Sequence, residues 1–121
     1  MCISRIEWRA VNVVETLQIR LSNGTGSPKV GVNKFNGTFD FPKDVKIKTI
    51  TVRHDAEWVE MISFNDEKDG CIVSLEGTNK TKDNQITTIT LDDQKGEKLI
   101  GFVAVKCDKW MRGIQFLTTL T

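Results

Sequence analysis

Hydrophobic and polar residues alternate along most of this chain. The clearest alternation occurs at these apolar positions: Leu17, Ile19 and Leu21; Phe39 and Phe41; Ile62 and Phe64; Ile114 and Phe116. A period of two places successive side chains on opposite faces of an extended strand, and the Thr, Val and Ile residues in between favour pleated strands. Turn signals separate the runs at Asn23-Gly24, Asn36-Gly37, Asp69-Gly70 and Lys95-Gly96. The pattern predicts an all-β fold, and the length fits a single domain over residues 1–121.

One apolar pattern occurs three times, beginning near Ile3, Ile47 and Leu99. Each copy reads apolar, two residues, apolar, one residue, apolar, and continues with a polar loop and a second strand. The equivalent positions are Ile3, Ile6, Trp8, Val13, Leu17 and Ile19; Ile47, Ile50, Val52, Trp58, Ile62 and Phe64; Leu99, Phe102, Ala104, Trp110, Ile114 and Phe116. A self-similar period indicates a repeat architecture. Three copies predict three small sheets around a pseudo-threefold axis, packed on a shared core.

The spacing within each first strand predicts a local irregularity. Ile47 and Ile50 are three residues apart, so they cannot face the same side of a regular strand. A β-bulge or a bend between them would restore the same facing. The same spacing separates the first two apolar residues of the other two copies. We therefore expect one backbone irregularity to be used three times.

These segments resemble the jacalin-related lectin family. The resemblance rests on ISRIEWR with VETLQI, on KIKTITV with WVEMISF, on ITTITL followed by GEKL, and on LIGFVAV with MRGIQF. The last pair is similar to the family's I-x-G-F-x-G-x…L-D-A-I-G-x ending through Gly101-Phe102 and Gly113-Ile114. The resemblance implies a β-prism of three Greek-key antiparallel sheets, each with four strands, and loops at one end that bind a mannose- or galactose-type glycan. The family's glycine-rich N-terminal segment has no counterpart before the first copy, so we expect one sheet to keep an open edge.

The family's sugar site implies the candidate binding residues. Its Gly-x-x-x-Asp motif lies in the last strand pair, where Cys107 falls near the glycine and Arg112 at the aspartate. In the other two copies Glu15 and Glu60 fall at the aspartate position. A carboxylate and neighbouring backbone N–H groups suit the vicinal hydroxyls of a hexose. The resulting candidates for carbohydrate binding are Asp55, Glu57, Glu60, Asp108, Lys109, Trp110 and Arg112.

Trp110 is the candidate that allows more than one interpretation. Asp108 supplies a carboxylate from a position shifted relative to the family motif, and Trp110 could cover the apolar face of a sugar. Trp110 also matches Trp58 and Val13 in the other copies, which favours a packing role at the start of a strand. Both roles for Trp110 stay open.

A second hypothesis treats the domain as a protein-interaction or assembly module without sugar affinity. An open sheet edge presents backbone N–H and C=O groups that invite a strand from another chain. We therefore expect a protein partner or a homo-oligomer along that edge. A third interpretation is an ordinary β-sandwich in which the threefold pattern is a coincidence.

The composition argues against several other classes. Seventeen basic and sixteen acidic residues give a net charge of +1, whereas a dedicated nucleic-acid binder normally carries a basic face. Lys43, Lys46 and Lys48 form only a small basic patch, which is typical of a solvated face. No window has the roughly 18 consecutive apolar residues that a membrane span needs. Three cysteines without paired spacing and the charged N-terminus favour the cytoplasm, or a mature chain from which a leader has been removed.

The sequence also lacks the residue sets of an enzyme or a metal site. His54, the one histidine, lies beside Asp55, but no nucleophile is marked out to work with them. Asp92-Asp93 has no spaced set of oxygen ligands around it. We expect no catalytic activity, no cofactor and no metal ion.

Overall fold

The structure, a computed structural model, consists of strands and connecting loops. It describes residues 3–26, 29–31, 34–43, 45–55, 58–68, 70–78, 80, 82, 84–91, 96–107 and 110–119, with the backbone alone for residues 100, 103–107, 110–113 and 119. The strands in this part of the chain are β1 (Ile3–Ala10), β2 (Val14–Leu21), β3 (Gly37–Asp40), β4 (Thr49–His54), β5 (Val59–Asn65), β6 (Cys71–Glu76), β7 (Gln85–Thr90), β8 (Lys98–Cys107) and β9 (Trp110–Thr119). The all-β prediction is confirmed. Within these same residues there is no helix of the length and apolarity that crossing a membrane requires.

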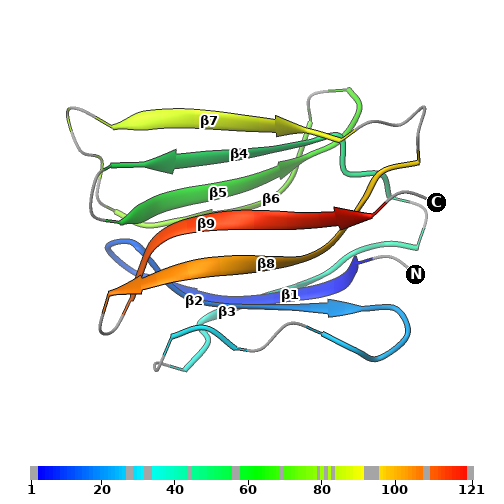
Figure 1. The fold of residues 1–121 in the computed structure, drawn as a ribbon, viewed down its shortest axis with the longest axis horizontal. Helices are drawn as coiled ribbons and strands as arrows, with labels where there is room; N and C mark the ends of the chain where they lie inside the picture. Colours follow the sequence, from blue (N-terminus) through cyan, green and yellow to red (C-terminus); the bar gives the residue numbers. More distant parts are fainter. Residues whose placement is uncertain are drawn as a thin grey trace.

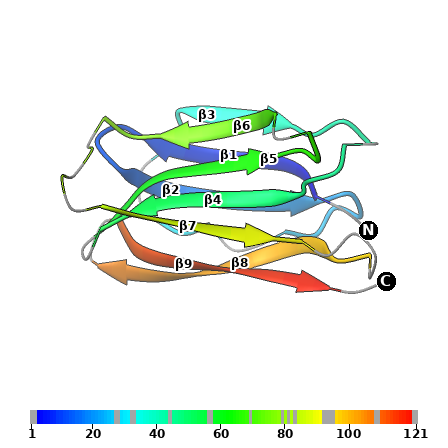
Figure 2. The ribbon, with the colours of Figure 1, turned by 90° about the horizontal axis from the view of Figure 1, so that it is seen from above.

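The strands form three antiparallel sheets, and all run roughly along the long axis of the molecule (Figure 1). The strand orders are β2-β1-β3 in the first sheet, β6-β5-β4-β7 in the second and β8-β9 in the third. Figure 2 shows the same strands from above. Three separate sheets differ from the two packed sheets of an ordinary sandwich. Each repeated sequence segment forms one hairpin: β1 with β2, β4 with β5, and β8 with β9.

The three hairpins share one strand register. The first set of equivalent pairs is Ile6 with Ile19, Ile50 with Phe64, and Phe102 with Phe116. The next set, two residues further along, is Trp8 with Leu17, Val52 with Ile62, and Ala104 with Ile114. A register shift of one residue would turn these side chains to the opposite face. The shared register therefore keeps the equivalent apolar positions on one side of each hairpin.

The irregularity expected at the start of each unit is present in β1 and β8. The pairing shifts between Ile3 and Arg5 in β1 and between Leu99 and Gly101 in β8, which leaves one extra residue in each strand. In the second unit β4 begins at Thr49, so Ile47 precedes the strand. All three leading apolar side chains, those of Ile3, Ile47 and Leu99, are buried.

The three sheets differ in how many strands they contain. In the second sheet β7 lies beside β4, so that the order 7-4-5-6 is that of a Greek key. In the first sheet two isolated bridges, Leu17 with Val30 and Arg20 with Gly26, add a short segment beside β2. The third sheet has β8 and β9 alone in the described part of the chain. Within the described residues, four regular strands therefore occur in the second sheet and not in the other two.

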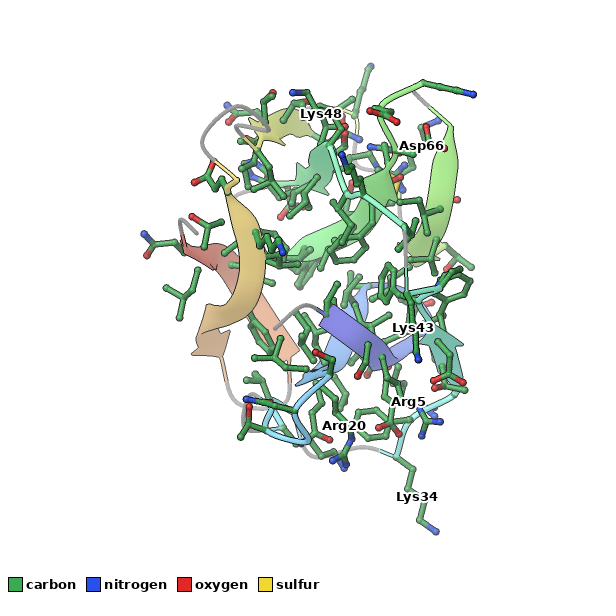
Figure 3. All side chains as sticks on the ribbon, turned by 90° about the vertical axis from the view of Figure 1, so that its right-hand side faces the viewer. Arg5, Arg20, Lys34, Lys43, Lys48 and Asp66 are labelled. Atoms are coloured by element: carbon green, nitrogen blue, oxygen red, sulfur yellow. The ribbon has the colours of Figure 1, made fainter. Side chains whose placement is uncertain are left out.

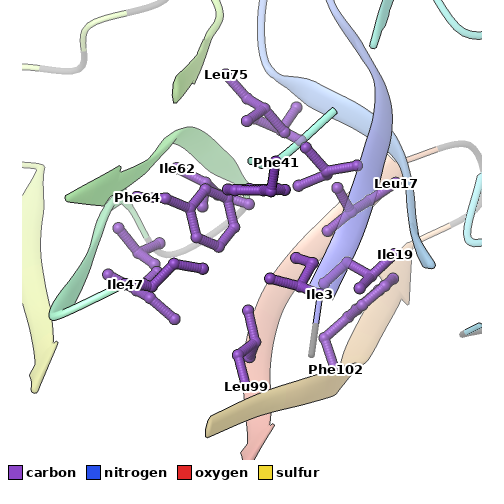
Figure 4. Packing of buried hydrophobic residues seen from close by; sticks show 14 of the residues in the cluster. Ile3, Leu17, Ile19, Phe41, Ile47, Ile62, Phe64, Leu75, Leu99 and Phe102 are labelled. Carbon is purple, nitrogen blue, oxygen red and sulfur yellow. The ribbon is translucent and has the colours of Figure 1, made fainter. Parts of the chain in front are cut away.

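Apolar side chains from all three sheets meet in one core (Figure 4). A series of edge-to-face aromatic contacts crosses the core. The ring centroids lie 5.0 Å apart for Phe39 and Phe41, 6.1 Å for Phe41 and Phe64, and 6.1 Å for Phe64 and Phe116. Such contacts add to the stabilisation from burial itself. These four rings join the first, second and third sheets, so the sheets form one packed unit.

Candidate functional site at the hairpin-loop end

The loops of the three hairpins lie at the same end of the molecule. This hairpin-loop end, on the left of Figure 1, carries the connections between β1 and β2, between β4 and β5, and between β8 and β9. The chain termini lie at the opposite end. Four candidate sugar-binding residues lie in the described parts of the second and third hairpins at this end: Asp55, Glu60, Trp110 and Arg112.

Each hairpin has a second register shift beside its loop. The pairing jumps between Arg9 and Ala10, between Arg53 and His54, and between Val105 and Lys106. The extra residue on the returning strand is Glu15 in the first hairpin, Glu60 in the second and Arg112 in the third. Two residues then oppose one, which is the arrangement of a β-bulge. These are the three positions that the sequence resemblance aligns with the family's aspartate.

The carboxylate of Glu60 is a fully buried charged group at this end. The residue is 0% exposed, and its Oε1 accepts hydrogen bonds from Arg53 Nε and Asn84 Nδ2, both at 3.3 Å. Arg53, whose side chain is 8% exposed, also donates from Nη1 to Glu76 Oε2 at 3.0 Å. A buried carboxylate needs such partners, because burying an unpaired charge is costly. Glu60 therefore holds β4, β5 and the start of β7 together.

Asp55 shapes the loop between β4 and β5. Its Oδ1 accepts a hydrogen bond from the backbone N–H of Trp58 at 2.9 Å, and its own N–H donates to the Trp58 carbonyl at 3.2 Å. This side chain-to-backbone bond stabilises a tight turn. Asp55 is half-buried, and Glu57, between the two residues, lies outside the described residues.

Near its loop, at residues 103–107 and 110–113, the third hairpin is described by its backbone alone. Asp108 and Lys109 lie outside the described residues, and Trp110 opens β9, where it pairs with Cys107. Arg112 occupies the bulge, and β9 packs against β2 and β5 of the neighbouring sheets. The strand that carries Trp110 and Arg112 is therefore a neighbour of β5, the strand that carries Glu60.

The ion pairs behind these bulges are not among the features predicted from the sequence. Arg9 Nε lies 3.3 Å from Glu15 Oε2, which repeats the contact between Arg53 and Glu60 at the equivalent positions of the first hairpin. The signal was available, because an arginine and a glutamate recur at matching positions in the first two copies. The third copy has Val105 in place of the arginine, so its residue types cannot form the same pair.

A backbone contact ties the first two hairpins together. Gly77, which follows β6, donates its N–H to the Glu60 carbonyl at 2.9 Å, and Thr78 donates its N–H to the Val11 carbonyl at 2.8 Å. A Cβ atom on Gly77 would clash with the Asn12 carbonyl. The absence of a side chain at Gly77 therefore allows the segment after β6 to approach the β1–β2 loop this closely.

No protein-family model and no curated protein sequence matches this chain. Its fold is similar to that of a prostate-specific WGA16 glycoprotein lectin, with a TM-score of 0.70 and 16% identity over 99% of this chain and 83% of the lectin. It is also similar to the biofilm matrix protein Bap1 of V. cholerae, with a TM-score of 0.66 and 15% identity over 98% of this chain. The chain spans 21% of the length of Bap1. The chain therefore has a lectin-like β fold.

Proposed function

We propose that this chain is a carbohydrate-binding module related to the jacalin-type lectins, with atypical binding loops and no catalytic activity. The observation that carries the proposal is the likeness of nearly the whole chain to a glycoprotein lectin. The repeated bulged hairpins, which all present their loops at one end, add to that support. The jacalin-type β-prism and its threefold arrangement are part of the proposal.

In this proposal the loops of the second and third hairpins contact a mannose- or galactose-type glycan. Asp55, Glu57 and Asp108 supply carboxylate acceptors for sugar hydroxyls, while Lys109 and Arg112 supply donors. Trp110 covers the apolar face of the sugar ring. Glu60 is already bonded to Arg53 and Asn84, so its part is to hold the second loop in place while its neighbours contact the ligand.

A glycan array with purified protein tests the proposal. We expect retention of mannose- or galactose-type glycans, and a loss of about tenfold to a hundredfold in affinity for Arg112→Ala and for Asp55→Asn, because each removes a charged hydrogen-bonding group. Arg5→Gln is the matched control, because Arg5 lies in β1 away from the loops. Failure to retain any glycan, or equal retention by all four proteins, would contradict the proposal.

A second candidate function is an assembly module, and the third sheet supports it. In the described part of the chain β8 and β9 have no further strand beside them, so both edges of this sheet can accept a strand from another chain. The likeness to a biofilm matrix protein fits such a role. Sedimentation velocity tests self-association: we expect the sedimentation coefficient to rise with protein concentration. A constant monomer value over a wide concentration range would contradict a homo-oligomer.

A further inference from the structure

A pocket of about 340 Å³ lies at the end of the molecule opposite the hairpin loops. Its lining includes Ile3, Ile47 and Leu99, the leading apolar residues of the three repeated units. Figure 4 labels these three side chains, which come from β1, from the segment just before β4 and from β8. At this end the three sheets leave a space between their starting residues.

The floor of this pocket is apolar. Ile3, Ile47, Leu91 and Leu99 are all buried, and Val45 adds a half-buried side chain on the segment between β3 and β4. Binding is favourable when a hydrocarbon surface replaces water over such an apolar floor, because apolar area is removed from water. The volume lies in the range of small-molecule pockets, which combine such a lining with a few polar groups.

The rim of the pocket carries three lysines. Lys43, Lys46 and Lys98 are exposed, and none forms an ion pair within the described part of the chain. Figure 3 faces this end of the molecule and labels Lys43. Among the described residues of the lining, Glu97 is the one acidic residue, and its Oε2 accepts a hydrogen bond from Thr118 Oγ1 at 2.7 Å. The described lining residues therefore carry an excess of positive charge, three lysines against Glu97, above an apolar floor.

We propose that this pocket binds a small organic anion with an apolar body, of the class of a medium-chain carboxylate. The apolar body lies against Ile3, Ile47 and Leu99, and the anionic group lies among the rim lysines. Lysine ammonium groups act as flexible point charges, so they suit a terminal carboxylate without demanding one fixed geometry. A neutral hexose has no apolar body of this kind, so this site is separate from the sugar site proposed above and does not depend on it.

Isothermal titration calorimetry of the full chain with octanoate, below its micelle concentration, tests the proposal. We expect saturable binding with one site. Hexanoate and butanoate should bind progressively more weakly, by roughly fourfold for each methylene removed. Octanol and octylammonium have the same apolar body without the negative charge, and each should bind at least about tenfold more weakly than octanoate.

Two variants and one control locate the site. The combined substitution Lys43→Gln, Lys46→Gln and Lys98→Gln should weaken octanoate binding at least about tenfold. Val45→Phe should weaken it further by filling the pocket, and circular dichroism should show that this loop variant stays folded. Lys68→Gln should leave binding unchanged, because Lys68 lies exposed in the turn between β5 and β6 and does not line the pocket.

The proposal is overturned by any of three results. The first is the absence of saturable octanoate binding by the wild-type protein. The second is equal affinity for octanoate, octanol and octylammonium, which would make the charged rim irrelevant. The third is unchanged octanoate binding in both the combined lysine variant and the folded Val45→Phe variant.

Discussion

The first and second hairpins carry the same ion pair in different surroundings. In both, an arginine Nε lies 3.3 Å from the carboxylate of a glutamate in the bulge. In the first hairpin the Arg9 and Glu15 side chains are 34% and 15% exposed, whereas in the second the Arg53 and Glu60 side chains are 8% and 0% exposed. In the second hairpin Asn84 also donates a hydrogen bond to Glu60, and Arg53 also donates one to Glu76. One repeated motif thus serves as a partly solvated contact in one sheet and as a buried network in the next.

The largest expected effect is that of Glu60→Ala. Removing one partner of a buried ion pair leaves the other charge without its main compensation, which typically costs about 3–5 kcal/mol of the free energy of unfolding. Because Arg53 retains Glu76, we expect a loss near the lower end of that range. Urea denaturation followed by circular dichroism measures it.

The matched control replaces both partners by apolar residues, as Arg53→Met with Glu60→Leu. Such a replacement avoids an uncompensated charge, so the double variant should lose less stability than Glu60→Ala alone. A loss below about 1 kcal/mol for Glu60→Ala would equal that of a surface pair, and it would remove the distinction between the two hairpins.

The second largest loss of stability is expected at Gly77, where the segment after β6 contacts the loop between β1 and β2. In Gly77→Ala the new methyl group meets the Asn12 carbonyl and lies 2.7 Å from Val13 Cα, so the backbone must shift. Overpacking of this kind costs about 1–3 kcal/mol in unfolding free energy. Gly101→Ala in β8 is the control, because its methyl group would meet only Leu117 Cδ1 at 3.8 Å. Equal unfolding midpoints for the two variants would show that close approach at Gly77 is unimportant.

A smaller effect is expected for Glu15→Ala in the first hairpin. Partly exposed ion pairs are screened by water and contribute about 0–1 kcal/mol. A double-mutant cycle with Arg9→Ala and Glu15→Ala should give a coupling energy in that range, measured by thermal or urea unfolding. A coupling energy as large as the loss from Glu60→Ala would mean that burial does not set the difference.

The smallest effect on stability is expected for the exposed ion pair between Arg5 and Asp40. Arg5 Nε donates to Asp40 Oδ1 at 2.6 Å, and this hydrogen bond lowers the pKa of Asp40 from its ordinary value of 3.8. The pair therefore adds stability above the unfolded-state pKa, and that stability is lost as the pH falls through the folded-state pKa. In Arg5→Gln the Asp40 pKa should rise toward 3.8, as measured by carbon NMR during an acid titration. An Asp40 pKa that is the same in both proteins would show that Arg5 does not bind this carboxylate in solution.

Much of the hairpin arrangement could be predicted from the sequence. The apolar residues of the three copies set the register, and the odd spacing of Ile3 and Ile6 predicted the extra residue that β1 contains. Strand β6 was not singled out, because Leu75 is its one fully buried residue and the alternation is therefore weak. The resemblance implied that Glu60 contacts a sugar, but its enclosure depends on Arg53 and Asn84 from other strands. Such partners come together only through tertiary packing, which spacing along the chain does not reveal.

The pocket at the end opposite the hairpin loops also could not be predicted from the sequence. Lys43 and Lys46 were noted as a basic patch typical of a solvated face. Their position above buried Ile3 and Leu99 follows from how the starts of three separate hairpins converge. Alternation of apolar and polar residues predicts which residues face the core. It does not predict whether other side chains fill the space beside them.

The most direct test of the account is a titration of the nitrogen-15-labelled protein with mannose and with galactose, followed by amide NMR. The account predicts saturable shifts for one of the two sugars, concentrated on Asp55 to Glu60 and on Cys107 to Arg112, with little change at Ile3, Ile47 and Leu99. Unshifted amides with both sugars, or shifts confined to the end that carries the lysine-rimmed pocket, would contradict a sugar site at the hairpin-loop end.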